Sequence, residues 1–134
     1  MERYKRSIIG KIKNHTRLLL ISAFEKMVKL KPINEKKEVY YIIRRDGHGA
    51  GFFSNYLWVL SHIMYAEDLG MIPVVDMKHY PTLYSENYVV NGTKNAWNYY
   101  FEDISPVSLH KAYASRNFVL SKYVYYEKYV RLLA

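Results

Sequence analysis

The stretch VYYIIRRDGHGAGFFSNYLWVLSHIMYAEDLGMIPVVD, residues 39–76, decides the fold. It opens with β-branched and aromatic residues over 39–43, which is typical of a buried strand. A glycine-rich turn follows, then an amphipathic helix to about residue 69, and a second short strand at 72–76. This order predicts a βαβ unit, in which the two strands are parallel and the crossover is right-handed.

Local signals mark the ends of the predicted helix. A side-chain oxygen of Ser54 or Asn55 is expected to cap its first turn, and Gly70 stands where a glycine commonly ends a helix. Pro73 falls near the start of the second strand, where a missing N–H donor matters least. The helix is therefore expected to run from about residue 54 to about residue 69.

The rest of the chain is less regular. Residues 3–30 have a helical pattern, residues 96–101 predict a short helix, and residues 118–120 predict a third strand. A last helix is expected over 123–133, and it reaches the C-terminus without a stop signal. We therefore expect residues 1–37 to form a basic amphipathic helix with a linker, and residues 38–134 to form a truncated Rossmann-like domain.

The net charge of +8 is concentrated near the N-terminus. Residues 1–37 hold eleven Lys and Arg against three Glu, which is +8, whereas the remaining chain holds nine of each sign. Such an arm is typical of contact with an anionic surface. The helix at 3–30 could lie on an anionic membrane or dock on its own domain, and the sequence leaves both open. Nucleic acid is not favoured, because basic residues do not alternate with aromatic ones.

Cysteine usage and hydropathy suggest a compartment. The chain has no cysteine, which excludes disulfides and thiolate metal sites. The apolar run at residues 18–24 is far shorter than the ~20 residues that span a bilayer. We therefore expect a cytoplasmic protein, with peripheral contact at the inner membrane face as its only membrane association.

The glycine-rich turn indicates phosphate chemistry. The start of a helix offers backbone N–H groups and the positive end of the helix dipole, and glycines let a phosphate approach closely. Gly49 and Gly51, with Ser54 in the third position, differ by one residue from a dinucleotide fingerprint, and Asp76 stands where an acidic residue would bind ribose. A dinucleotide-binding Rossmann domain is thus one alternative, although the bulky Phe52 and Phe53 count against it.

Residues 44–76 resemble the opening βαβ segment of the fucosyltransferase-like glycosyltransferases, which include α-1,6- and protein O-fucosyltransferases and bacterial relatives in surface-polysaccharide clusters. The family turn has the form G-x-F-G-N-Q. Residues 51–56, GFFSNY, match it at Gly51, Phe53 and Asn55 and depart from it at Ser54 and Tyr56. Residues 69–75, 80–84 and 95–102 are similar to family members as well.

The resemblance implies a GT-B architecture of which this chain is the N-terminal half. It implies a sugar nucleotide, GDP-fucose, as the donor and a glycan as the acceptor, without cofactor or metal. Gly49, Gly51, Phe53, Ser54 and Asn55 would form the donor-facing turn, with Asn55 reaching the diphosphate. An arginine that the family carries in its second domain has no counterpart here, so the isolated chain is expected to be inactive. A non-catalytic remnant or interaction module is the alternative.

Other side chains are candidates for catalysis or binding because of their type and position in the sequence. His48 lies among glycines near Asp46 and is a candidate catalytic base. Arg44 and Arg45 follow a strand, so at most one of them should face a phosphate. His62, His79 and His110 show no metal-ligand spacing. The aromatic residues that could stack on sugar rings are Tyr80, Tyr84, Trp97, Tyr99 and Tyr100.

Two structural expectations test the site most directly. The strands at 40–43 and 72–75 should be adjacent and parallel, with the helix packed across them. The backbone N–H groups near 51–55 should point outward at the carboxyl edge of the sheet. Asn55 should lie in the first turn of the helix with its side-chain amide exposed to solvent.

Overall fold

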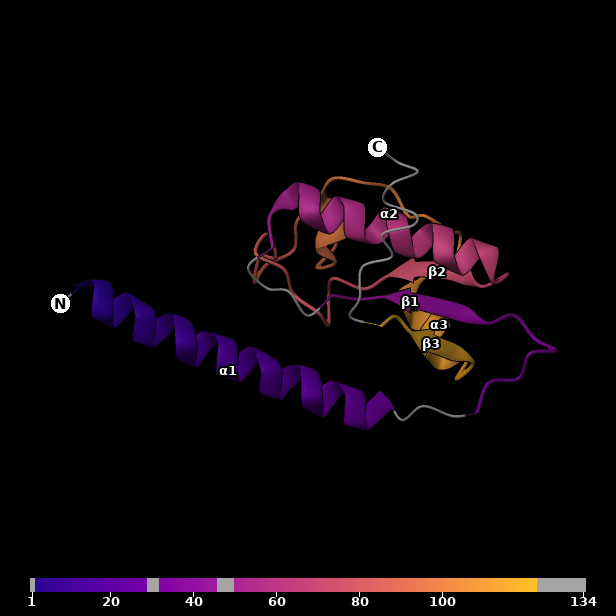
Figure 1. Cartoon of the computed structure of the whole chain (residues 1–134), viewed down its shortest axis with the longest axis horizontal. Helices are drawn as coiled ribbons and strands as arrows, with labels where there is room; N and C mark the ends of the chain where they lie inside the picture. Colours follow the sequence, from indigo (N-terminus) through magenta and orange to yellow (C-terminus); the bar gives the residue numbers. More distant parts are fainter. Residues whose placement is uncertain (1, 29–31, 46–49, 123–134) are drawn as a thin grey trace.

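A computed structural model describes residues 2–28, 32–45 and 50–122 (Figure 1). The expected helix at 123–133, and the candidates His48 and Gly49, lie outside these residues. In chain order the elements are α1 (Glu2–Val28), β1 (Tyr40–Ile43), α2 (Phe52–Asp68), β2 (Ile72–Val75), the 3₁₀ helix η1 (Ala96–Tyr99), α3 (Leu109–Ala114) and β3 (Phe118–Leu120). They form a mixed α/β fold around a small parallel sheet.

Strand β1 is the centre of the sheet. The strand order is β2-β1-β3, and both pairings are parallel. Tyr40 lies opposite Ile72 of β2 and opposite Phe118 of β3. The predicted βαβ unit and the predicted third strand are therefore confirmed, and the architecture is compatible with a Rossmann-like half-domain.

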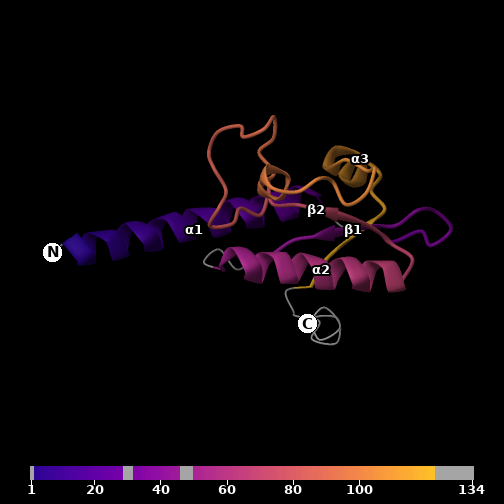
Figure 2. The same cartoon turned by 90° about the horizontal axis from the view of Figure 1, so that it is seen from above.

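The sheet is covered on both faces (Figure 2). On one face Tyr41 and Ile43 pack with Trp58 and Val59 of α2, in a cluster that also includes Trp97. On the other face lies a second cluster, whose buried members are Tyr40, Ile42, Val74, Val107, Ala112 and Phe118. Alternate residues of β1 thus pack into two different cores, which explains why all four of its residues are apolar or aromatic.

Helix α2 begins earlier than the sequence predicted. Its N-cap is Gly51, so the expected capping by Ser54 or Asn55 is wrong. The backbone N–H of Phe52 instead donates to the Tyr84 hydroxyl at 3.0 Å, and the Phe52 ring packs edge-on against the Tyr84 ring. A partner 32 residues away therefore caps the helix, and local sequence rules do not reveal it.

The C-terminal end of α2 agrees with expectation. Leu69 is the C-cap, and Gly70 follows with a φ of +68°, a left-handed conformation that favours glycine. The region 96–101 forms η1, a single 3₁₀ turn shorter than the predicted helix. Helix α3, capped by the Ser108 hydroxyl, was not anticipated.

The second half of α1 docks on the domain. Arg17 and Ile21 are buried, and the Arg17 Nε donates to the Pro81 carbonyl at 3.3 Å. One turn later Phe24 stacks on His79 with a ring-centroid distance of 4.1 Å. The spacing of these residues places them on one side of the helix. Of the two roles left open for this helix, docking on its own domain is therefore observed.

Asn117, immediately before β3, ties the linker after α1 to the sheet. Its side chain is buried, accepts from the Asn34 N–H at 2.8 Å, and donates to the carbonyls of Asn34 (3.1 Å) and Glu38 (2.7 Å). We predict that Asn117→Ala lowers the free energy of unfolding by about 2 kcal/mol, because three partly buried hydrogen bonds are lost. Urea unfolding measures this, with the exposed Asn87→Ala as control. Equal destabilisation by the two variants would contradict it.

Candidate functional site at the carboxyl edge of the sheet

Polar side chains gather where the three parallel strands end. Arg44 and Arg45 follow β1, Asp76 follows β2 and Ser121 follows β3. The Arg44 N–H donates to the Ser121 hydroxyl at 2.9 Å, and the Asp76 N–H donates to the Ile43 carbonyl at 2.9 Å. Parallel pairing thus brings residues far apart in the chain to one edge, where α/β proteins bind ligands.

The turn into α2 is open at Gly51. This residue has a φ of −68°, which any residue can adopt, and, apart from its chain neighbours, no atom of the described residues lies within 4 Å of where a Cβ would stand. The described structure therefore does not itself require glycine at this position. The next two residues form the first turn of the helix, and the Phe53 side chain is 76% exposed. The predicted residues Gly51, Phe53 and Ser54 thus lie together at the start of α2.

Asn55 differs from expectation. Its side chain is only 6% exposed, so the prediction of a solvent-exposed amide is wrong. The Oδ1 atom accepts from the Arg45 Nη1 at 3.0 Å, and the Nδ2 atom donates to the Ala50 carbonyl at 3.3 Å. Both polar atoms of the amide are therefore bonded within the protein. Asn55 therefore holds the turn and the arginine in place.

Arg45 brings a positive charge to the first turn of α2. Besides Asn55, its Nη1 donates to the Ser54 hydroxyl at 3.0 Å, and the guanidinium lies 4.8 Å from the ring centroid of Trp58. Arg44 points elsewhere, donating to the Ser121 carbonyl and pairing with Glu25 of α1. The two arginines thus have different partners, as alternation after a strand predicts.

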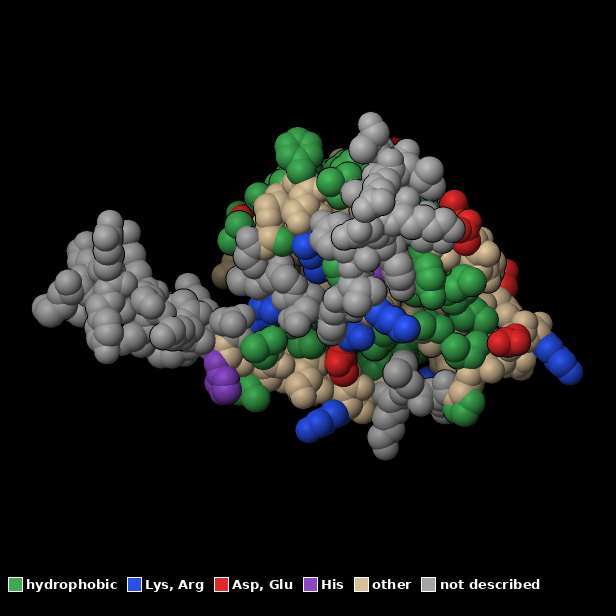
Figure 3. Space-filling view, viewed as in Figure 1, with side chains coloured by type: hydrophobic (Ala, Val, Ile, Leu, Met, Phe, Trp, Pro, Cys, Tyr) green, Lys and Arg blue, Asp and Glu red, His purple; other side chains and the backbone are tan. Residues whose placement is uncertain are grey.

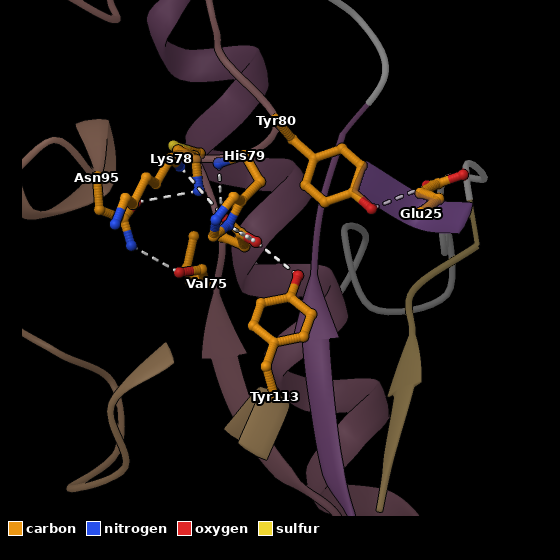
Figure 4. Close-up of polar contacts among 9 residues, drawn as sticks. Glu25, Val75, Lys78, His79, Tyr80, Asn95 and Tyr113 are labelled. Carbon is orange, nitrogen blue, oxygen red and sulfur yellow. Dashed lines mark hydrogen bonds and ion pairs between the residues drawn. The ribbon is translucent and has the colours of Figure 1, made fainter. Parts of the chain in front are cut away.

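Helix α1 contributes to the same edge through Glu25. Its carboxylate pairs with Arg44 and accepts from the Tyr80 hydroxyl at 2.8 Å (Figure 4). Burial, followed by the hydrogen bond to Glu25, raises the pKa of Tyr80 well above its ordinary value, so the hydroxyl remains a donor. In the space-filling view of Figure 3, Lys and Arg side chains lie around an acidic side chain near the middle of the molecule.

Asp76 is the centre of a cluster that sequence reasoning missed. The side chain is fully buried. Its Oδ1 accepts from the N–H groups of Lys78 (3.0 Å) and His79 (2.9 Å), and its Oδ2 accepts from His79 Nδ1 (2.9 Å) and the Tyr113 hydroxyl (2.6 Å). Both oxygens are thus engaged inside the protein, which removes the ribose-binding role expected of Asp76 in a dinucleotide site. The signal in the sequence was an Asp-x-x-His directly after a strand.

Tyr113 reaches this cluster from α3. Burial, and then the negative charge of Asp76, raise the pKa of the Tyr113 hydroxyl well above its ordinary value. The hydroxyl therefore stays protonated at physiological pH and donates to Asp76. The rings of His79 and Tyr113 lie edge-on to one another near the end of β2, and both side chains bond to the same Asp76 oxygen (Figure 4).

The predicted aromatic residues are mostly structural. Tyr80, Trp97 and Tyr99 are buried, whereas Tyr100 is 59% exposed. Tyr84 is half-buried and supplies the hydroxyl that caps α2. Of the five aromatic residues predicted to contact a sugar, Tyr100 is the one that is mostly exposed to solvent. It lies edge-on to Phe52, close to the open turn.

Comparison of the chain with models of protein families, with curated proteins and with solved structures gives no match. Among the residues described, no helix combines the length and apolar character that crossing a membrane requires. What the chain does is therefore inferred from the geometry of the carboxyl edge and from the resemblance around residues 51–56.

Proposed function

We propose that this chain is the N-terminal, Rossmann-like domain of a fucosyltransferase-like glycosyltransferase, and that the start of α2 faces the diphosphate of a sugar nucleotide such as GDP-fucose. The observation that carries the proposal is the open turn at Gly51 with Arg45 beside it. A sugar would pass from this donor to a glycan acceptor, as in polysaccharide biosynthesis.

The physical case combines shape and charge. The N-terminus of a helix carries a partial positive charge, and the guanidinium of Arg45 adds a full one. Gly51 leaves space where a side chain would hinder a phosphate. Asn55, the residue expected to touch the donor, serves in this proposal as a positioning residue that orients Arg45. The exposed ring of Phe53 offers a surface for a sugar or base.

A non-catalytic interaction module is the rival proposal. Such a module needs neither an open turn nor an affinity for nucleotides, so nucleotide binding discriminates between the two. The dinucleotide alternative is less well supported, because Asp76 has both oxygens occupied by protein donors.

We predict that GDP binds the 134-residue chain and shifts the backbone N–H resonances of residues 51–55 in ¹⁵N–¹H spectra. Arg45→Gln should weaken binding about tenfold or more, because a charged hydrogen bond contributes roughly 1.5–3 kcal/mol. Gly51→Ala should also weaken it, by obstructing the phosphate, while changing the free energy of unfolding by less than about 1 kcal/mol.

The matched control is Lys36→Gln, which removes the same charge from an exposed site in the linker before β1. It should bind GDP as the wild type does. The proposal is wrong if GDP leaves the resonances of residues 51–55 unchanged. It is also wrong if Lys36→Gln and Arg45→Gln weaken binding equally, because equal weakening would indicate attraction by net charge only.

We further propose that the outward side of α1 rests on an anionic membrane surface. Leu18 and Leu19 are 43% and 57% exposed, although Arg17 and Ile21 of the same helix are buried against the domain. Residues 1–37 carry eleven Lys and Arg, and those other than the buried Arg17 complement anionic lipid headgroups. The protein would then be peripheral at the inner membrane face.

This second proposal predicts binding to vesicles that contain phosphatidylglycerol, weakening as salt rises, because each nearby Lys or Arg contributes ~1 kcal/mol that salt screens. The double variant Leu18→Gln/Leu19→Gln should reduce co-sedimentation several-fold. Leu83→Gln, which changes an equally exposed leucine on the 77–95 loop, should not. Equal binding to pure phosphatidylcholine, or no binding to either vesicle, would refute the membrane role.

A further inference from the structure

His79 is held in one orientation by groups on several sides. Its Nδ1 lies 2.9 Å from Asp76 Oδ2, one ring face stacks on Phe24 with an interplanar angle of 5°, and Tyr113 lies edge-on at 5.7 Å. A carboxylate can only accept, so the Nδ1 atom carries the proton in this hydrogen bond. The neutral imidazole is therefore fixed in the tautomer whose Nε2 has a lone pair.

The His79 side chain borders a cavity. A space of about 420 Å³ lies between α1 and the segment after β2, and His79 forms part of its wall. Its other walls are the apolar residues Leu20, Ile21, Phe24 and Pro81 and the cationic residues Arg17 and Lys78. This volume is within the usual range for small-molecule sites. The His79 side chain is 30% exposed, and in the described residues no hydrogen bond to Nε2 is found.

A second histidine, His62, has a purely structural role and serves as a comparison. His62 is fully buried, and its Nδ1 lies 2.8 Å from the Tyr41 hydroxyl inside the core between α2 and the sheet. His79 also has a buried partner, but that partner is a carboxylate and the ring borders a cavity. A buried carboxylate that orients a partly exposed imidazole is the arrangement that general-base catalysis requires.

We propose that Asp76 and His79 form a general-base pair that activates the hydroxyl group of an acceptor bound in this cavity. The inference rests on the proposed transferase function and assigns its base. As the acceptor oxygen bonds to the anomeric carbon of the sugar nucleotide, the hydroxyl proton moves to His79 Nε2. The bond from the anomeric carbon to the phosphate oxygen breaks, and the nucleoside diphosphate leaves with that electron pair. The Asp76 carboxylate offsets the positive charge on the imidazolium until its proton passes to solvent.

The segment that begins with the pair also contacts the phosphate turn. Asp76 and His79 stand at its start, and Tyr84, a few residues later, binds the first N–H of α2. Base and donor site therefore both lie at the carboxyl edge of the sheet. Asp76 and Tyr113 are positioning residues, because they act on the acceptor only through His79.

The base can be tested without sugar transfer, through hydrolysis of p-nitrophenyl acetate by the 134-residue chain. The Nε2 lone pair attacks the acyl carbon, and nitrophenolate leaves with the electron pair of the broken C–O bond. Water then hydrolyses the acyl-imidazole to acetate, so the rate reports the availability of that lone pair. We expect His79→Gln to lower the rate at least tenfold, and Asp76→Asn to do the same, because the amide favours the wrong tautomer. His110→Gln, on the exposed part of α3, should keep the wild-type rate. Circular dichroism checks that each variant is folded.

A ¹⁵N spectrum of the histidine rings gives an independent measurement of the tautomer. In the neutral ring of His79, the proton should be on Nδ1 in the wild type and on Nε2 in Asp76→Asn. An Nε2–H tautomer in the wild type, or unchanged hydrolysis in His79→Gln, would overturn the inference even if GDP binds. Loss of hydrolysis in His79→Gln with no GDP binding would support the base pair and refute the donor site instead. If Asp76→Asn does not fold, the hydrolysis rate of His79→Gln and the tautomer of the wild type still test whether His79 is the base.

Discussion

Strand β1 is hydrogen-bonded along both edges and buried on both faces, and the rest of the structure depends on that position. Its four residues alternate between two cores, so each must be large and apolar. Parallel pairing on both sides requires each crossover to return the chain to the same end of the sheet. As a result, every strand ends at one edge, and the first polar residue after each strand meets the others there.

This constraint accounts for the density of polar contacts at the carboxyl edge. Arg44 reaches Ser121, 77 residues away, and Tyr113 reaches Asp76, 37 residues away. Each buried polar group there has protein partners, as burial demands. The edge divides into a cationic part at the start of α2, around Arg45, and a carboxylate–imidazole part after β2. In a transferase the first would receive the diphosphate and the second the acceptor hydroxyl.

Helix α1 contributes side chains to this edge. Glu25 pairs with Arg44, and Phe24 covers one face of the His79 ring. The proposed acceptor cavity exists only because α1 supplies one of its walls. The outward side of the same helix exposes leucines and belongs to the most basic part of the sequence. One helix thus takes part in both the proposed membrane surface and the proposed acceptor site.

Local sequence signals determined the elements that need only near neighbours. The apolar run of β1, the left-handed Gly70 and the third strand all follow from periodicity and backbone preference, and each was predicted correctly. The tertiary structure decided what depends on distant partners. Asn55 is buried at the start of α2, and the first N–H of that helix, at Phe52, donates to Tyr84, 32 residues away. The Asp76–His79–Tyr113 cluster forms only when α3 folds back onto β2. A hydrogen bond between residues far apart in the chain leaves no periodic trace, so no local pattern could have placed these side chains.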